Sequence, residues 1–264
     1  MATYSYQGFQ IHYTQEGEGQ TIVFLHGLGG NSINWLYQRN HFKKEYQCLA
    51  VDMPGHGKSE GGEELDFYDY QAVLKELLLD QLQLDQILLC GVSMGGRVAL
   101  DFAARYPDAV SGLVVADSFA GLDEEEKKRR KDIFDLIYDP NGGVERWVNT
   151  VIEQMGLDPQ GAIARGFHKG ILDNQLDFMY NLFTMLLDYD QRNLLTSISA
   201  PALIIHGERD RFIPYECSQD IHHRLIDSEL VVIPDCGHLP NVEQPKAFNA
   251  LLEGFAEKVY KKTW

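Results

Sequence analysis

The stretch that decides the fold is CGVSMGGR at residues 90–97, directly behind the apolar run at 87–89. A serine stands between two glycines where the apolar run ends. Glycine lacks a Cβ atom, so glycines on both sides permit a bend that other residues would block. A G-x-S-x-G turn between a strand and a helix lifts the serine hydroxyl above the edge of a sheet. The motif therefore predicts a buried strand, a strained turn at Ser93 and a helix that begins at Met94.

Short apolar runs recur along the chain and alternate with helical patterns. Most runs are continuously apolar, as in strands covered on both faces. Their alternation with helices predicts an α/β fold with a mostly parallel sheet and helices on both faces. The first two runs are too close for an intervening helix, so we expect an antiparallel hairpin at the edge. The predicted strands are residues 10–14, 21–25, 47–51, 86–90, 110–116, 202–206 and 230–233, and the helices include 66–83, 94–106 and 244–260.

One region interrupts this alternation. Residues 119–199 show helical periodicity without a convincing strand, and they contain several aromatic residues, Trp147 among them. The charged run DEEEKKRRKD at 123–132 is most simply a solvated helix face. We predict a helical cap over residues 119–199, and a core domain formed by residues 1–118 and 200–264.

Composition excludes several classes of function. The chain has 264 residues, 44% of them hydrophobic, and a net charge of −16. That charge weighs against binding nucleic acid or an anionic membrane surface. The sequence shows no signal peptide, no membrane-spanning run and no paired cysteine motif, so we expect a cytoplasmic protein with reduced thiols. We expect a small-molecule substrate, and either a monomer or a homodimer.

Residues that can do chemistry follow the predicted strands. Open α/β sheets bind ligands beyond the carboxyl ends of their strands. A serine, an aspartate and a histidine each stand just past such a run, in the chain order Ser93, Asp210 and His238. We therefore expect the three side chains to meet at one edge of the sheet.

These three residue types can form a nucleophilic triad. A serine hydroxyl is a weak nucleophile alone, so it needs a neighbouring base, for which His238 is the candidate. An acid at Asp210 would hold the imidazole in the correct tautomer and stabilise its protonated form. Three other carboxylates remain rivals for the acid: Glu208, Asp235 and Asp117.

The developing oxyanion needs hydrogen-bond donors. The backbone N–H of Met94 would lie at a helix N-terminus, where free N–H groups favour negative charge. We expect the second donor in the glycine-rich HGLGG segment at 26–30, at the N–H of Leu28.

Taken together, these motifs resemble the α/β-hydrolase superfamily over nearly the whole chain. The resemblance implies an eight-stranded sheet, a helical cap after the sixth strand, a Ser-His-Asp triad, no metal and no organic cofactor. The matching motifs are HGLGG at 26–30, DMPGHGKS at 52–59, GVSMGG at 91–96, HGERDRFIP at 206–214 and GHLPNVEQP at 237–245.

Three residues are candidates for contact with substrate: Arg97, Trp35 and Trp147. Arg97 lies one helical turn after Ser93. It could pack along apolar surface, or it could bind a substrate carboxylate through its two-pronged guanidinium group. Residues 91–100, GVSMGGRVAL, resemble the menaquinone-pathway family that eliminates pyruvate, in which an arginine at this place serves a carboxylate, although Val92 departs from that family's aromatic residue. Trp35 could be core or pocket wall.

The sequence thus predicts a serine hydrolase that cleaves a carboxylic ester through an acyl-enzyme. Carbon–carbon bond hydrolysis and pyruvate elimination use the same triad and remain alternatives. A non-catalytic receptor that binds a ligand in the same fold is an alternative of another class. Halide displacement is disfavoured, because it needs an aspartate in the place of Ser93.

Overall fold

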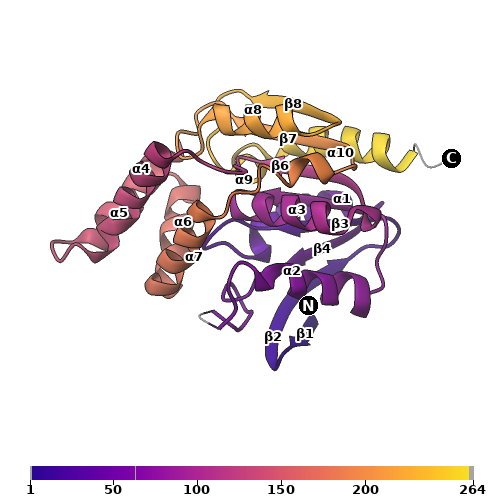
Figure 1. Ribbon diagram of the computed structural model, residues 1–264, viewed down its shortest axis with the longest axis horizontal. Coiled ribbons are helices and arrows are strands. Elements are labelled where there is room, and N and C mark those ends of the chain that lie inside the picture. Colours follow the sequence, from indigo (N-terminus) through magenta and orange to yellow (C-terminus); the bar gives the residue numbers. More distant parts are fainter. Residues whose placement is uncertain (1, 63, 262–264) are drawn as a thin grey trace.

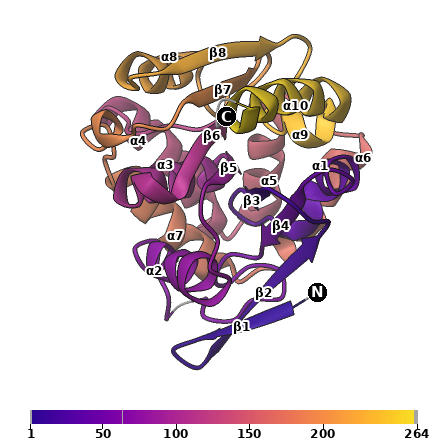
Figure 2. The same cartoon turned by 90° about the vertical axis from the view of Figure 1, so that its right-hand side faces the viewer.

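The computed structural model describes residues 2–62 and 64–261, and at its centre lies an eight-stranded sheet. The strand order is β1-β2-β4-β3-β5-β6-β7-β8, which Figure 2 shows from bottom to top. The six strands from β3 to β8 run parallel, and β2 pairs antiparallel with both of its neighbours, β1 and β4. The mostly parallel α/β sheet predicted from the sequence is confirmed. The strands are β1 (Ala2–Tyr6), β2 (Phe9–Glu16), β3 (Thr21–Leu25), β4 (Gln47–Val51), β5 (Ile87–Val92), β6 (Val110–Ala116), β7 (Ala202–Gly207) and β8 (Ser228–Ile233).

The predicted hairpin between the first two apolar runs is wrong. The edge hairpin joins β1 to β2, and β2 then pairs with β4, so β3 lies inside the sheet between β4 and β5. Every residue of β3 is buried, as a central strand covered on both faces requires. The segment from β2 to β3 contains Gly17 and Gly19, both at positive φ, which lets it bend past the end of β4.

Helices cover both faces of the sheet, as Figure 2 shows. One face carries α2 (Asp69–Leu74), α3 (Met94–Arg105) and α8 (Tyr215–Arg224), and the other carries α1 (Leu36–Phe42) and α10 (Pro245–Lys261). The helix predicted over 66–83 is divided, because α2 continues as π-helical turns, η2 (Lys75–Gln81). Shorter helical turns are η1 (Ser32–Trp35), η3 (Pro107–Ala109), η4 (Leu136–Tyr138), η5 (Leu195–Ser197) and α9 (Pro240–Glu243).

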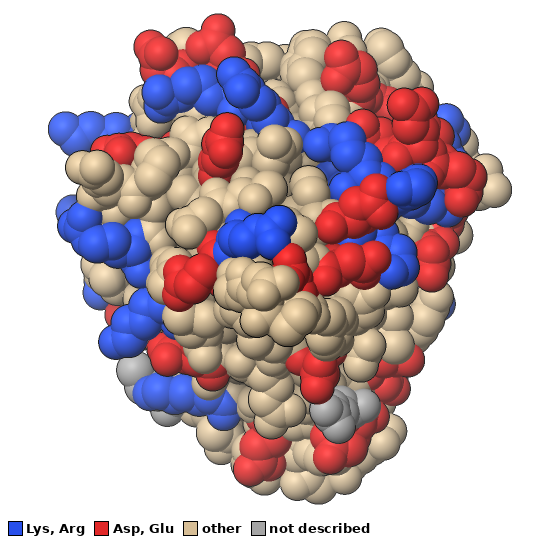
Figure 3. Space-filling model, turned by 90° about the vertical axis from the view of Figure 1, so that its left-hand side faces the viewer, with Lys and Arg blue, Asp and Glu red and all other residues tan. Residues whose placement is uncertain are grey.

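Four helices fill the chain between β6 and β7 and lie together beyond one end of the sheet, at the left in Figure 1. They are α4 (Glu124–Asp135), α5 (Gly143–Gln154), α6 (Ala162–Leu172) and α7 (Leu176–Asp188). Most charged side chains of α4 pair along its exposed face, and Figure 3 shows acidic and basic groups interspersed on this side of the molecule. Arg130 differs in being buried, with a side chain that is 1% exposed, although it too lies near a carboxylate, 3.4 Å from Glu126.

Aromatic stacking joins these helices to one another. Phe134 of α4 stacks on Phe183 of α7, with ring centroids 3.5 Å apart, and meets Trp147 of α5 edge-on at 5.1 Å. Such pairs stabilise a packed interface by about 0.5–1.5 kcal/mol beyond the area that they bury. Within residues 2–62 and 64–261, no helix is both long enough and apolar enough to cross a bilayer.

Candidate active site

The turn between β5 and α3 has the strained geometry that its glycines predict. Ser93 adopts a positive φ of 55° with ψ of −119°, which is unusual for a residue with a side chain. A Cβ atom on Gly91 would collide with the backbone of Gly95, and one on Gly95 would collide with the carbonyl of Leu25. The turn is held on its other side because the Ser93 N–H donates to the Ala116 carbonyl at 2.9 Å. The strain is therefore imposed by the surrounding strands.

His238 and Asp210 form a buried hydrogen-bonded pair. The His238 Nδ1 lies 2.7 Å from Asp210 Oδ2, and neither side chain is more than 4% exposed. The other oxygen, Asp210 Oδ1, accepts from the backbone N–H groups of Phe212 (2.8 Å) and Ile213 (3.0 Å). Because the carboxylate accepts the hydrogen bond from the Nδ1–H group, the Nε2 atom of His238 is left as the acceptor that a general base needs.

His238 also forms a hydrogen bond with α5. Its backbone N–H donates to the Met155 carbonyl at 2.9 Å, and the Arg211 N–H donates to the Gln154 carbonyl at 2.8 Å. The C-terminal end of α5 thus accepts hydrogen bonds from the loops that carry both His238 and Asp210.

Ser93 and His238 line one cavity of about 50 Å³, which we call the inner chamber. The chamber lies between the sheet edge and the helices α4 to α6. Trp147 forms part of its wall, and the ring of Phe212 lies edge-on to the His238 ring at 5.3 Å. The inner chamber is lined by Leu28, Ser93, Phe134, Trp147, Phe212 and His238, together with further apolar side chains.

The backbone between Gly27 and Leu28 lies beside Ser93. A Cβ built on Gly27 would be 3.3 Å from the Ser93 Cβ and 3.8 Å from its Oγ. The Gly27 carbonyl accepts from the Gly30 N–H (3.0 Å) and pairs with His26 Nδ1 (2.8 Å). Because N–H and C=O point in opposite directions across a trans peptide, these bonds also fix the direction of the Leu28 N–H. Met94 is the first residue of α3, so its N–H has no acceptor within the helix.

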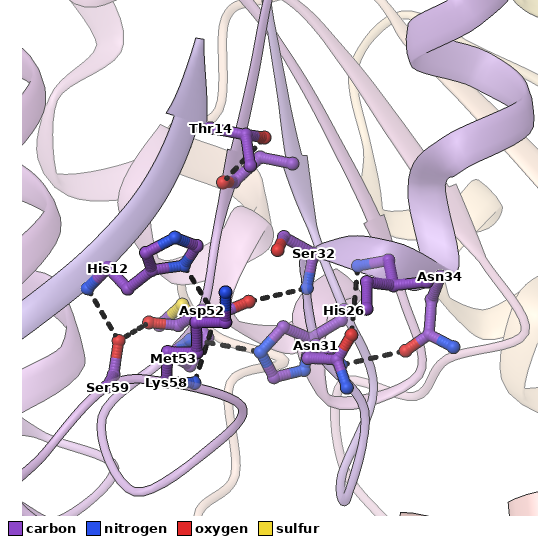
Figure 4. Close-up of polar contacts among 12 residues, drawn as sticks. His12, Thr14, His26, Asn31, Ser32, Asn34, Asp52, Met53, Lys58 and Ser59 are labelled. Carbon is purple, nitrogen blue, oxygen red and sulfur yellow. Dashed lines mark hydrogen bonds and ion pairs between the residues drawn. The ribbon is translucent and has the colours of Figure 1, made fainter. Parts of the chain in front are cut away.

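His26 connects this loop to the loop after β4, as Figure 4 shows. Its Nε2 accepts from the Met53 N–H at 3.0 Å, while Nδ1 donates to the Gly27 carbonyl. Burial lowers the pKa of His26, so the ring is neutral, as this pair of bonds requires. His26 therefore braces the loop, as its place in a glycine-rich segment suggests.

Asp52 anchors the second half of the same network (Figure 4). It accepts from the backbone N–H groups of Ser32 (2.6 Å) and Lys58 (3.1 Å) and pairs with His12 Nδ1 (2.7 Å). Burial raises the pKa of Asp52, but the hydrogen bonds from Ser32 and Lys58 outweigh it and leave the pKa below its usual value. The loops after β3 and β4 are thus tied to one buried carboxylate.

The three rival carboxylates take other places. Glu208 accepts from the backbone N–H of Asp235 at 2.9 Å. Asp117 is fully buried, at a φ of 43°, and its Oδ1 accepts from the Gly207 N–H at 2.8 Å. Its Oδ2 faces no hydrogen-bond donor among the described residues. Burial and the nearby charge of Asp210 raise the pKa of Asp117 well above its usual range.

Asp117, Asp210 and His238 also bring three potential metal-ligand atoms within 4.8 Å of one another. The bond between His238 and Asp210 and the two N–H groups on Asp210 already engage most of these atoms. The hydrogen bonds within the protein therefore account for the arrangement of these three side chains.

Two predicted substrate contacts lie in the core. Arg97 is fully buried; its Nη2 donates to the Tyr189 carbonyl and its guanidinium lies 4.2 Å from the centre of the Phe119 ring. Trp35 is also fully buried, between Phe24 and the α10 residue Phe248. Neither residue lines the inner chamber, so the arginine packs along apolar surface and does not face the cavity.

Sequence reasoning missed Phe212, which follows Asp210 by two residues. Its backbone N–H holds the carboxylate and its ring covers the imidazole. Its position directly behind the proposed acid was the available signal.

Comparisons with known proteins agree with this geometry. Residues 22–251 match the alpha/beta hydrolase family. A 2-hydroxy-6-oxononadienedioate/2-hydroxy-6-oxononatrienedioate hydrolase of Paraburkholderia phymatum is 29% identical, over 93% of this chain and 90% of its own. A 3-oxoadipate enol-lactonase of Acinetobacter baylyi is 26% identical, over 97% and 96%.

A solved structure gives the same result. A thermophilic esterase from Thermogutta terrifontis superimposes with a TM-score of 0.81 and 26% identity, covering 97% of both chains. The family match spans most of the sequence, and the sheet, the strained serine turn and the loop order are those described above. This chain therefore belongs to the α/β hydrolase family.

Proposed function

We propose that this protein is a serine hydrolase that cleaves carboxylic esters through an acyl-enzyme. The observation that carries the proposal is the buried His238–Asp210 pair at 2.7 Å, on the same chamber as the strained Ser93. A hydroxyl, a base with a free nitrogen and two backbone N–H groups are the parts that acyl transfer needs.

The proposed reaction uses these groups in two steps. Ser93 Oγ attacks the ester carbonyl while His238 Nε2 accepts the hydroxyl proton, and the N–H groups of Leu28 and Met94 stabilise the oxyanion. Collapse of the tetrahedral intermediate breaks the bond to the alcohol oxygen, and His238 returns its proton to that oxygen. Water then attacks the acyl-enzyme, with His238 again as the base, and releases the acid and free Ser93. Asp210 stabilises the imidazolium in both steps.

Hydrolysis of p-nitrophenyl acetate tests the proposal. We expect turnover by the wild type and a loss of at least about 10⁴-fold in kcat for Ser93→Ala, because the remaining groups cannot replace the nucleophile. Ser197→Ala, at an exposed serine in η5, is the control and should retain full activity. A fluorophosphonate probe should label the wild type and not Ser93→Ala.

Two results would overturn the proposal. Equal turnover by wild type and Ser93→Ala would show that another group does the chemistry. A folded wild type that neither turns over the ester nor reacts with the probe would favour a ligand-binding receptor.

Cleavage of a carbon–carbon bond by the same triad is a second candidate. The observation that favours it is the 29% identity to the Paraburkholderia enzyme named for a dienedioate. Incubation with 2-hydroxy-6-oxononadienedioate, followed by its absorbance, separates this candidate from ester hydrolysis.

A further inference from the structure

An apolar groove lies outside the inner chamber, between the loop after β3 and helix α6. Its volume is about 470 Å³, roughly nine times that of the inner chamber by the two volumes. Three of its apolar residues are unusually exposed: Ile33 is 67% exposed, Leu36 is 45% exposed and Tyr37 is 54% exposed. We call it the outer groove; its walls include Ile33, Leu36, Tyr37, Ile163, Gly166 and Val242.

The outer groove and the inner chamber meet at the proposed oxyanion loop. Gly27, Leu28, Phe167 and Leu239 line both cavities. Leu239 directly follows the general base, and Leu28 supplies a proposed oxyanion donor. A molecule whose carbonyl lies between these two residues can therefore place one end in each cavity.

Neither cavity offers a cation to a substrate. Among the described residues, none that lines the outer groove or the inner chamber is lysine or arginine. The polar groups of the groove are neutral, and Asn34 and Asn31 accept from nearby backbone N–H groups. The net charge of −16 further disfavours a carboxylate in either cavity.

The chemistry of the two steps decides which half of an ester occupies which cavity. The acyl group stays on Ser93 until water releases it, so it must fit the chamber that holds Ser93. That chamber has room for roughly two water-sized groups. The alcohol leaves when His238 protonates it, and the open groove that begins beside Leu239 is the way out.

We propose that the outer groove binds the apolar alcohol chain of a neutral ester whose acyl group is short. This inference rests on the proposed ester hydrolysis and narrows it to a substrate class. It also separates this chain from its Paraburkholderia relative, because a dienedioate carries two carboxylates and neither cavity holds a cation to receive them.

Two substrate series test the proposal with the wild type. In the first, the acetate esters of ethanol, butanol and hexanol are followed by proton release in a pH-stat. We expect kcat/KM to rise about two- to fourfold for each methylene that the groove buries. In the second, p-nitrophenyl esters from acetate to octanoate should lose at least tenfold in kcat/KM, because the inner chamber is small.

A charged probe tests the absence of a cation. The acetate ester of 6-hydroxyhexanoate has the same chain length as hexyl acetate but ends in a carboxylate. We expect its kcat/KM to be at least tenfold below that of hexyl acetate. Equal values would show that the groove does not exclude an anion, and that result would overturn this part of the proposal.

Gly166→Leu tests the location of the groove. A Cβ on Gly166 would meet no atom within 4 Å, so the leucine can extend into the groove, and it favours the helix α6 more than glycine does. The variant should lower kcat/KM for hexyl acetate by a factor at least tenfold larger than its effect on kcat/KM for ethyl acetate. Gly254→Leu, at an equally open and exposed site in α10, is the matched control and should leave kcat/KM unchanged for both substrates.

The outcomes separate this inference from the proposed function. If ethyl acetate is turned over in a Ser93-dependent way but the alcohol series is flat, the ester hydrolase stands and the groove proposal fails. The groove proposal also fails if the acyl series rises with length, or if Gly166→Leu and Gly254→Leu behave alike. Turnover that does not depend on Ser93 would instead overturn the function itself.

Discussion

Replacing Asp117 by asparagine should stabilise the protein, and the gain should grow with pH. Asp117 lies directly behind the His238–Asp210 pair, buried, with one oxygen on the Gly207 N–H and the other facing no donor among the described residues. Its φ of 43° is a conformation that asparagine also tolerates well. Asparagine keeps the acceptor for Gly207 and removes the buried acid.

The magnitude follows from proton linkage. Burial raises the pKa of Asp117 well above its usual range, so the folded chain holds a proton that the unfolded chain releases above about pH 4. The stability that this group contributes is complete below that unfolded pKa and falls by about 1.4 kcal/mol for each pH unit until the folded pKa is reached. The unfolding free energy of Asp117→Asn relative to wild type should therefore rise with pH above about pH 4, by at most about 1.4 kcal/mol for each pH unit.

Urea unfolding of both proteins at pH 5, 6 and 7 measures this difference. The groups that face Asp117 (Asp210, His206, His238 and Glu243) are present in both proteins, so the comparison isolates residue 117. Asp235→Asn, at an exposed position that also has positive φ, is the control and should show no such trend.

A second measurement on the same variants tests the acid. Asp117→Asn should keep kcat/KM for p-nitrophenyl acetate within about threefold, whereas Asp210→Asn should lose about 10⁴-fold through the wrong tautomer of His238. A stability difference that is flat from pH 5 to pH 7 would refute the buried proton. Loss of activity in Asp117→Asn with retention in Asp210→Asn would refute the assignment of the acid.

Three further variants test the loops and the core. His26→Ala should lower kcat by about 10- to 100-fold with little change in KM, because the Leu28 N–H is no longer held in place; circular dichroism confirms folding, and a change confined to KM would contradict the role. Arg97→Met should change kcat/KM for neutral and carboxylate-bearing esters by the same factor, and keep the unfolding free energy within about 1 kcal/mol of wild type or raise it, because burial lowers the pKa of Arg97 to about 9; selective loss of the charged ester would contradict the core position. Gly91→Ala should abolish labelling by a fluorophosphonate and lower the melting temperature, because its Cβ would collide with Gly95; an active, stable variant would show that the turn is less tight than described.

Much of the fold could be predicted because the central strands carry their signal locally. The apolar runs at β4 and β6 match the predicted bounds, since a strand buried on both faces must be apolar throughout. The hairpin at the edge of the sheet was predicted wrongly, because strand pairing there has no such local signal. β1 alternates exposed residues with residues that are mostly only half-buried, over a short span. The order of β2, β4 and β3 depends on pairing between distant segments, which no local pattern encodes.

Parts of the candidate site could likewise be predicted from the sequence, and other parts could not. Ser93, Asp210 and His238 follow strands, and parallel strands end at one edge, so their convergence was predictable. Arg97 was not, because helical spacing gives its distance from Ser93 but not the direction of its side chain. The position of Arg97 depends on the Tyr189 carbonyl and the Phe119 ring, which belong to the segment after β6. The two cavities likewise depend on how α5 and α6 pack against the sheet.

The hydrogen bonds from the loops that carry Asp210 and His238 to the end of α5 restrict which helices can move to open the chamber. If α5 swung outward, the Met155 carbonyl would leave the backbone of His238, and the imidazole would move with it. Opening by that helix would thus displace the proposed base, whereas motion of α6 alone would leave His238 in place. Amide hydrogen exchange should accordingly be slower at residue 238 than along α6. Substrate and product should enter and leave beside α6 during turnover.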